Sequence, residues 1–175
     1  MPTLVVMIGI PGSGKSTLIQ RWSETQHCLV ISTDQIRAQL FGDEAIQGDW
    51  LLIWREVQRQ FRDAIAQIQT RTADFAIYDA TNTRRRNRRA VIALARAVGF
   101  TEMIGVWLDP PLELCVQRNQ ARFRQVPDEV LQKMYRQLWS CPPRLHEGLD
   151  LLLHYGTTPD LEDLLKQFEQ QALAK

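Results

Sequence analysis

The feature that most constrains this chain is a glycine-rich segment near its start, where residues 9–16 read Gly-Ile-Pro-Gly-Ser-Gly-Lys-Ser. The segment satisfies the full G-x-x-x-x-G-K-[ST] pattern, with an apolar stretch of strand type before it and a helical pattern after it. Its glycines let the backbone approach a phosphate closely, and the N-terminus of the following helix attracts the same negative charge. A glycine-rich turn without a ligand is the alternative, which the strand–helix context disfavours. We therefore expect a site for ATP and Mg²⁺ built from Gly9, Pro11, Gly12, Ser13, Gly14, Lys15, Ser16 and Thr17.

Two side chains of this segment have roles that follow from phosphoryl-transfer chemistry. Lys15 is expected to contact the β- and γ-phosphates, and the hydroxyl of Ser16 is expected to bind Mg²⁺. The pattern does not separate a kinase from a nucleotide-dependent switch or motor, because all of them use it. The acceptor must therefore be inferred from other residues.

Short apolar, β-branched segments alternate with longer segments of helical period, which is typical of a parallel sheet with crossover helices. The predicted strands are Leu4–Ile8, Cys28–Ile31, Phe75–Tyr78, Met103–Leu108 and Leu149–Leu153. The predicted helices are Ser16–Gln26, Asp34–Leu40, Trp50–Gln69, Arg85–Val98, Leu112–Gln120, Glu129–Leu138 and Leu161–Leu173. We predict one α/β domain over residues 1–175, a P-loop NTPase-type parallel sheet of about five strands flanked by helices, with an arginine-bearing lid. In such sheets ligands bind just beyond the carboxyl ends of the strands.

The composition gives no sign of a polyanionic partner, a zinc or redox site, or a membrane span. A formal net charge of +1 gives no bulk signal for a polyanion, although arginine supplies seventeen of the twenty-one basic residues. Arginine favours bidentate contacts with phosphate, and genomic composition explains the bias equally well. The three cysteines lack the spacing of a zinc or redox site. Without a signal-like segment or an apolar run of ~20 residues, we expect a cytoplasmic protein without membrane contact or an obligate protein partner.

Asp34 directly follows the second predicted strand, at the rim of the expected cleft. A carboxylate there can accept the proton of an attacking hydroxyl, which is the role of the base in phosphoryl transfer. Arg37 lies about one helical turn further on and is placed to bind an anionic substrate. The alternative is an N-capping Asp34 with a solvated Arg37. The spacing alone does not separate these interpretations.

The third predicted strand leads into Asp79, which is the form of an acidic strand end that helps to order Mg²⁺. Thr81 and Asn82 follow, and arginine then occupies five of the six positions 84–89. Arg85 and Arg89 share one helix face and are expected to clamp successive phosphates. The alternatives are a solvated helix face and a basic patch that is matched by acidic residues elsewhere in the chain. Cations at a helix start oppose its dipole, which favours a reason other than stability for keeping them.

Two further arginines, Arg118 and Arg122, lie one helical turn apart in the segment after the fourth predicted strand. An arginine supplied by a mobile segment neutralises charge on a transferred phosphoryl group. A pair of solvated surface residues is the alternative.

Taken together, these segments resemble the kinase domain of polynucleotide 5′-hydroxyl kinases, both the phage enzyme and the bacterial repair enzymes. The resemblance runs in unbroken order over about residues 3–140. The matching segments are Gly9–Thr17, Thr33-Asp34 with Arg37, Thr81-Asn82 with the arginines after it, and Arg118-Asn119 with Arg122.

The resemblance implies that Asp34 is the general base for a 5′-hydroxyl and that Arg37 binds a substrate phosphate near it. It also implies that Arg122, assisted by Arg118, contacts the ATP phosphates. Asp79 matches the bacterial pattern, in which one residue separates the acid from Thr-Asn, whereas the phage pattern has none. The family often carries a phosphatase as well, yet no Asp-x-Asp phosphatase loop is present in this chain.

We therefore expect a single P-loop kinase domain that transfers the γ-phosphate of ATP to the 5′-hydroxyl of a nucleic acid. Thr81, Asn82, Arg85 and Arg89 complete the expected substrate contacts, and Ser16 and Asp79 the expected metal site. A kinase for a small hydroxyl compound, such as a sugar, antibiotic or metabolite, uses the same loop, acid and lid arginines. A nucleotide-dependent binding or switch protein is the third possibility, and the sequence leaves both alternatives open.

Overall fold

The computed structural model describes residues 1–156 and residue 170, and within them strands alternate with helices as their sequence patterns predict. Apart from residue 170, the predicted helix Leu161–Leu173 and the end of the predicted domain lie outside the described residues. The elements are β1 (Thr3–Ile8), α1 (Lys15–Thr25), β2 (Cys28–Ser32), α2 (Thr33–Phe41), α3 (Trp50–Gln69), β3 (Phe75–Asp79), α4 (Arg85–Val98), β4 (Glu102–Leu108), α5 (Leu112–Gln120), α6 (Asp128–Ser140), the short 3₁₀ helix η1 (Leu145–Glu147) and β5 (Leu151–Tyr155).

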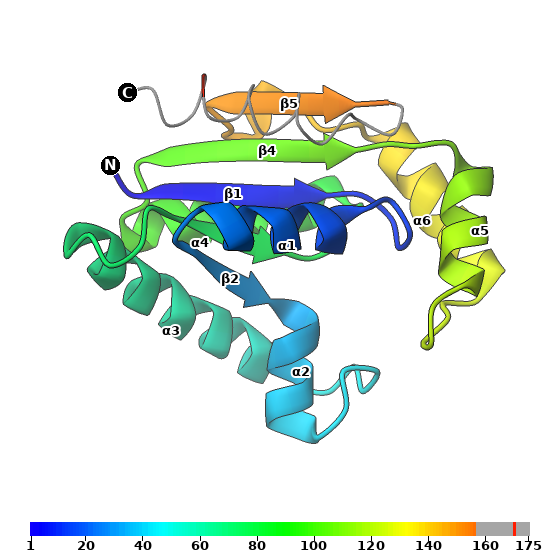
Figure 1. Ribbon diagram of the computed structural model, residues 1–175, viewed down its shortest axis with the longest axis horizontal. Helices are drawn as coiled ribbons and strands as arrows, with labels where there is room; N and C mark the ends of the chain where they lie inside the picture. The colour runs from blue at the N-terminus through cyan, green and yellow to red at the C-terminus, as the bar shows by residue number, and fades with distance from the viewer. Residues whose placement is uncertain (157–169, 171–175) are drawn as a thin grey trace.

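In the described part of the chain, the strands form one five-stranded parallel sheet in the order β2-β3-β1-β4-β5 (Figure 1). The central strand β1 pairs with β3 on one side, where Leu4 lies opposite Ala76, and with β4 on the other, where Leu4 lies opposite Met103. A strand with neighbours on both edges and helices on both faces is expected to be apolar throughout. Residues Leu4–Ile8 accordingly have no exposed surface.

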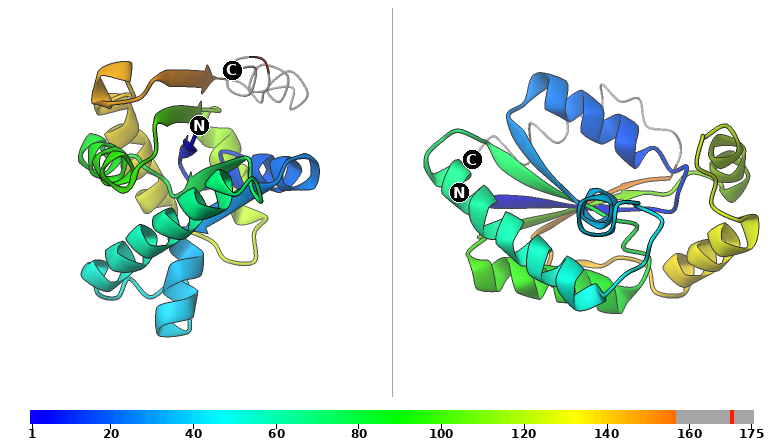
Figure 2. Two further views of the ribbon diagram at one scale, coloured as in Figure 1. Left: turned by 90° about the vertical axis from the view of Figure 1, so that its left-hand side faces the viewer. Right: turned by 90° about the horizontal axis from the view of Figure 1, so that it is seen from below.

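Alternate residues of β1 enter two separate cores, because successive side chains of a strand point to opposite faces. Val5 and Met7 pack with Trp22 of α1 on one face. Leu4 and Val6 pack with residues of α3, α4 and α6 on the other (Figure 2, right). The helices keep polar outer faces, and in the described residues none is long and apolar enough to cross a membrane.

The strand β5 begins two residues later than the sequence pattern predicts. Leu149 is buried before the strand begins, and its side chain fills the space above Gly105, where a Cβ would lie 2.7 Å from Leu149 Cδ1. Asp150 then turns the chain, because its carboxylate accepts from the amide of Met103 and from Arg96. The apolar character of Leu149 thus reflects a buried turn, and the ladder with β4 starts at Leu151.

Candidate active site

At Gly9 and Gly12, the glycine-rich loop between β1 and α1 passes too close to the neighbouring backbone to leave room for a Cβ atom. Gly12 has a φ of 81°, and a Cβ on it would lie 2.3 Å from the carbonyl oxygen of Cys115 in α5. A Cβ on Gly9 would lie 2.7 Å from the carbonyl oxygen of Leu108 at the end of β4. Both contacts are with backbone, which cannot move aside like a flexible side chain. Packing against β4 and α5 therefore requires these glycines.

Polar groups of the same loop are buried in a way that suits an anionic ligand. The hydroxyl of Ser13 is buried without a hydrogen-bond partner in the described structure, and an unpartnered buried donor is costly unless a ligand meets it. The ammonium of Lys15 donates to the carbonyl oxygens of Gly9 (2.7 Å) and Ile10 (3.1 Å). Burial lowers the pKa of Lys15 to about 8, although the carboxylate of Asp79 opposes the shift. The predicted phosphate loop thus has the buried cation and donors that phosphates require.

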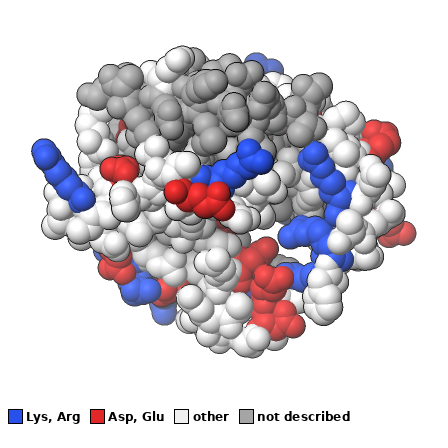
Figure 3. All heavy atoms as spheres, in the orientation of Figure 1, with Lys and Arg blue, Asp and Glu red and all other residues white. Residues whose placement is uncertain are grey.

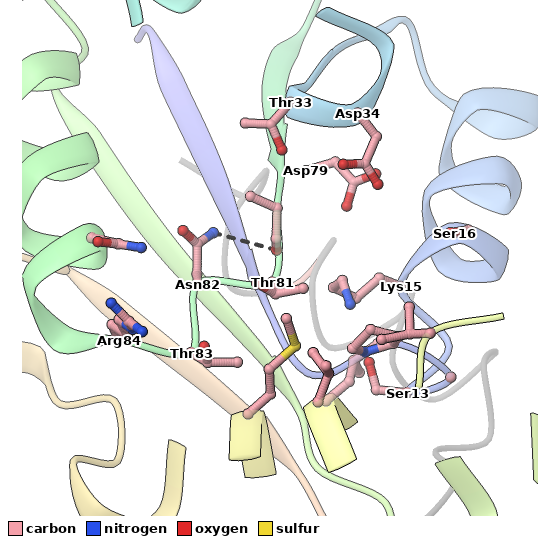
Figure 4. Close-up of a pocket in the computed structure, with 18 of the residues that line it drawn as sticks. Ser13, Lys15, Ser16, Thr33, Asp34, Asp79, Thr81, Asn82, Thr83 and Arg84 are labelled. Atoms are coloured by element: carbon pink, nitrogen blue, oxygen red, sulfur yellow. Dashed lines mark hydrogen bonds between the residues drawn. The ribbon is translucent and has the colours of Figure 1, made fainter. Parts of the chain in front are cut away.

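Two carboxylates face the loop from the neighbouring strands. Asp79 ends β3, and Asp34 lies in the first turn of α2, immediately after β2. Figure 4 shows the two carboxylates close together on the opposite side of the cavity from Lys15. Burial raises the pKa of Asp79, and Asp34 adds to the shift whereas Lys15 opposes it. The site therefore brings an acidic pair to the side of the expected phosphates.

Asp34 does not cap its helix, which removes the alternative that the sequence left open. Ser32 precedes the helix, and no side chain caps it. The carboxylate of Asp34 instead accepts from Arg37 Nη1 at 2.6 Å. The side chain of Asp34 is 57% exposed, while that of Arg37 is mostly buried and its Nε has no hydrogen-bond partner in the described structure. Arg37 thus orients the carboxylate and retains a donor that faces no protein acceptor.

The oxygen donors in the cleft fit Mg²⁺ delivered with a nucleotide better than a resident metal ion. Ser16 and Asp79 both line the cavity and supply a hydroxyl and a carboxylate. In the described part of the chain, no group of three or more His, Cys, Asp or Glu side chains is arranged to hold a metal. Mg²⁺ commonly uses one or two protein oxygens together with substrate phosphates and water. Ser16 and Asp79 are the residues of the cleft that could supply those protein oxygens.

The segment after β3 is tied to the glycine-rich loop rather than left free. Asn82 has a positive φ of 50°, and its buried amide donates to the carbonyl oxygen of Met7 at 2.7 Å (Figure 4 labels Asn82). The amide of Gly9 donates to the carbonyl oxygen of Thr81 at 3.0 Å. Thr81 and Asn82 line the cavity as predicted, but these bonds give them a positioning role in addition to any contact with substrate.

The arginine run divides among three environments. Arg84 and Arg86 line the cavity, whereas Arg85 and Arg89 are not among its lining residues. Arg85 contacts His146 of η1 at 2.9 Å, and Arg89 is exposed. The predicted clamp of Arg85 and Arg89 is therefore not brought to the cavity, because α4 turns that face outward. Arg84 and Arg86 line the cavity in place of Arg85 and Arg89, to which the sequence assigned that role.

Arg88 is completely buried and uses all five of its N–H groups. It forms a two-pronged ion pair with Glu147, with distances of 2.6 and 2.7 Å, and both side chains are at most 1% exposed. Its remaining donors reach the carbonyl oxygens of Asn82, Thr83 and Cys141. One member of the arginine run therefore fixes the segment after β3 to the loop before η1.

The predicted lid consists of the end of α5 and the turn of residues 121–127 before α6. Arg118 and Arg122 both line the cavity, and Arg118 Nη1 approaches the carbonyl oxygen of Gly12 at 3.5 Å. The side chain of Asn119 closes the turn, because it donates to the carbonyl oxygen of Val126 and accepts from the amide of the same residue. The arginines predicted for the lid thus face the glycine-rich loop.

The far end of this turn meets the other wall of the cleft. Arg124 forms an ion pair of 2.6 Å with Glu44, which lies in the loop between α2 and α3. Figure 3 shows a hollow in this region, with basic side chains on the α5–α6 side and acidic side chains on the α2 side. The cavity has a volume of about 1470 Å³. Ligand sites commonly measure about 300–1,000 Å³, so this cleft has room for a nucleotide and an acceptor together.

Several residues of the cleft were not found from the sequence. Arg84 and Arg86 were part of the arginine run but were not singled out. Trp50 and Trp54 have the helical spacing of core residues, so the spacing alone does not place them in the cleft. Arg88 had a detectable signal, because it shares the helical spacing of the buried residues Val91, Ile92 and Ala95. The clamp of Asn119 on its turn leaves no comparable pattern in the sequence.

Comparison with known proteins identifies related domains. A family model described as an AAA domain, AAA_33, matches residues 4–139. The L-seryl-tRNA(Sec) kinase of Methanococcus maripaludis is 26% identical over 136 residues, which cover 75% of this chain and 51% of that protein. The chain thus spans about half the length of this curated relative.

Solved structures share the fold. A chain of the Pnkp1/Rnl/Hen1 RNA repair complex superposes with a TM-score of 0.65 and 24% identity, covering 79% of this chain and 44% of that one. Shikimate kinase from Acinetobacter baumannii superposes with a TM-score of 0.59 and 17% identity, covering 99% and 94% of the two chains. These likenesses establish the P-loop kinase fold that the sequence predicts.

Proposed function

The chain belongs to the AAA domain family AAA_33, and from the arrangement of its cleft we propose that it is an ATP-dependent kinase that phosphorylates the 5′-hydroxyl of a nucleic acid. The observation that carries the proposal is that one cavity contains Lys15, the ion pair of Asp34 with Arg37, and arginines from three separate segments. Lys15 is suited to bind a nucleotide triphosphate. The Asp34–Arg37 pair is suited to a hydroxyl acceptor next to a phosphate. The arginines are suited to a substrate with several negative charges. We propose this role for the whole of residues 1–175 as a single kinase domain.

Each residue then has a defined part in the transfer. The carboxylate of Asp34 takes the proton of the acceptor hydroxyl as its oxygen bonds to the γ-phosphorus and the bond from that phosphorus to the β–γ bridging oxygen breaks. Lys15, Arg118 and Arg122 offset the charge on the phosphates and on the departing ADP. Ser16 and Asp79 would hold Mg²⁺, which would supply further neutralisation of the phosphate charge. Arg37 orients Asp34 and binds the acceptor phosphate.

Relatives and neighbours support a phosphotransferase and are consistent with a nucleic-acid acceptor. One relative is named as a kinase of L-seryl-tRNA, and one structural neighbour belongs to an RNA repair complex. A kinase for a small hydroxyl compound is the second candidate, since shikimate kinase matches nearly the whole of this chain and of its own. The two candidates differ in whether the acceptor carries phosphates beyond the reacting hydroxyl.

Incubation with labelled ATP and 5′-hydroxyl oligonucleotides of RNA and DNA tests the proposal, with shikimate and pentoses as small acceptors. We expect transfer to the oligonucleotides. Asp34→Asn should lower kcat by about 10²- to 10⁴-fold, the usual contribution of a general base, while ATP binding survives. If the protein binds ATP but phosphorylates only the small acceptors, the proposal is contradicted. If it phosphorylates no acceptor but binds a partner protein only when ATP is present, it is a nucleotide-dependent switch.

Variants of the arginine run test separately whether the acceptor is a nucleic acid, and the run also offers a matched control. Arg84→Gln with Arg86→Gln removes the two cavity-lining guanidinium groups, whereas Arg85→Gln with Arg89→Gln removes two from the outer face of the same helix. For an oligonucleotide acceptor, we expect the first pair to raise KM by about tenfold or more and the second pair to have a much smaller effect. Equal effects of the two pairs would show that the cavity arginines do not contact the acceptor.

A further inference from the structure

Two tryptophans line the cavity at the start of α3. The rings of Trp50 and Trp54 are stacked, with centroids 5.7 Å apart and an angle of 28° between their planes. The helical spacing that they share with Val57 and Phe61 predicts core residues, with base stacking by an exposed member of the stripe as the alternative. Val57 and Phe61 are fully buried, but Trp50 is 47% exposed and Trp54 is half-buried. The stripe of core residues therefore continues into the cleft as an aromatic surface.

The inner tryptophan holds the outer one in place. Trp54 packs against the apolar core, and its ring supports that of Trp50. The helix begins at Trp50 and is capped by Asp49, whose carboxylate accepts from the amide of Leu51 at 2.8 Å. The capped helix end holds the backbone at Trp50, and the ring of Trp54 restricts the orientations open to its side chain. One broad aromatic face is thus presented on a rigid element.

This surface lines the same cavity as the groups that we assign to the acceptor. Asp34 and Arg37 are in α2, which packs against α3. The loop between the two helices places Ala45 and Gln47 on the lining of the same cavity as Trp50 and Trp54. Across the cleft, α6 contributes the apolar side chains of Val130 and Met134. The cavity therefore combines a cationic, phosphate-binding region with a flat apolar one.

We propose that Trp50, backed by Trp54, stacks on the nucleobase of the acceptor nucleotide whose hydroxyl lies at Asp34. This inference rests on the proposed function and adds a specificity determinant to it. The cavity offers an aromatic surface to a planar ring, a carboxylate to a hydroxyl, and guanidinium groups to phosphates. A nucleotide unit contains all three of these groups. Stacking uses the π-face that every base has, so the acceptor site requires a base but does not select its identity.

Acceptors with and without a terminal base test the proposal. Two oligonucleotides are compared, identical except that the 5′-terminal residue of one is abasic. We expect the intact acceptor to have a KM at least about fivefold lower, which corresponds to one stacked base. Trp50→Ala should remove this difference by raising the KM of the intact acceptor alone, and Trp50→Phe should retain part of it.

Trp139 provides the matched control. It is 48% exposed, like Trp50, but it lies on α6 outside the cavity lining and contacts Trp107. Trp139→Ala should leave the preference for the intact acceptor as in the wild type. A preference that persists in Trp50→Ala, or one that is lost equally in both variants, overturns the proposal. Circular dichroism of each variant identifies a loss of folding, and Trp50→Phe then decides the outcome.

A binding measurement separates this inference from the proposed function. Intrinsic tryptophan fluorescence is titrated with the same two oligonucleotides in the absence of ATP. We expect quenching by the intact oligonucleotide at lower concentrations than by the abasic one, and a smaller amplitude in Trp50→Phe. If transfer to 5′-hydroxyls is absent but this pattern is found, the stacking site stands and the proposed reaction fails. If transfer occurs without any difference between the two oligonucleotides, the reaction stands and the stacking site fails.

Discussion

Replacing Glu147 with glutamine tests the buried ion pair that anchors the segment after β3. The substitution keeps the size of the side chain but removes its charge, which leaves the guanidinium of Arg88 without a counterion at 0% exposure. Removing one partner of a buried pair costs about 3–5 kcal/mol, because the remaining charge stays desolvated. For a chain of this size, about 2–4 °C of melting temperature is lost per kcal/mol. We therefore expect Glu147→Gln to lower the melting temperature by about 6–20 °C.

Urea unfolding followed by circular dichroism gives the free energy directly, and two variants serve as controls. Arg59→Ala breaks an ion pair with Glu56 and Asp63 on the surface of α3, where the arginine is 60% exposed, so stability should change far less. The double variant Arg88→Met with Glu147→Leu removes both charges and should recover much of the loss. A loss in Glu147→Gln no greater than that in Arg59→Ala would refute the reasoning, since the pair would then behave as a solvated one.

Two further predictions concern the glycine-rich loop. Because burial lowers the pKa of Lys15 to about 8 from 10.5, the ammonium loses its proton from about pH 8 upward, and the neutral amine no longer attracts phosphate. The dissociation constant for ATP should therefore rise by up to about tenfold per unit between pH 8 and 10, whereas Lys15→Arg, which stays charged, should show no such slope in calorimetric titrations. Gly12→Ala should abolish ATP binding, since its Cβ would lie 2.3 Å from a backbone oxygen of Cys115. Gly42→Ala has nearly the same φ (82°) but open space around it, so equal loss of ATP binding in both variants would show that the clash is not the cause.

The sequence predicted those parts of the fold that depend on local pattern. The central strand, the glycine-rich loop and the helices Trp50–Gln69 and Arg85–Val98 have strong periodicity or a specific motif, and their positions are confirmed. The beginning of β5 was misplaced, because an apolar residue in a buried turn looks like one in a strand. The pattern that placed Asp34 after β2 also left its capping role open, and only the contact with Arg37 resolved it.

The parts of the site that were missed depend on contacts distant in sequence. Arg88 is paired with Glu147, and the amide of Asn82, which follows β3, donates to Met7 in the neighbouring strand β1. Neither partner can be identified from spacing, because the two residues of each pair are 59 and 75 positions apart. The sequence nevertheless shows that Arg88 has the helical spacing of the apolar residues of α4. That spacing predicts that one arginine of the run is buried. Such a residue needs a carboxylate partner, so the search for Glu147 could have started from the sequence.

The central position of β1 has a consequence for how the chain folds. Its pairing partners lie far along the sequence, since Leu4 is opposite Ala76 and Met103, separations of 72 and 99 residues. At a synthesis rate of about 5–20 residues per second, β3 is made several seconds after β1, and β4 is made later still. Contacts of such long range also slow folding, because the intervening chain must be ordered first. A strand that is buried along its whole length in the folded protein thus has no pairing partner on the nascent chain until β3 has been synthesised.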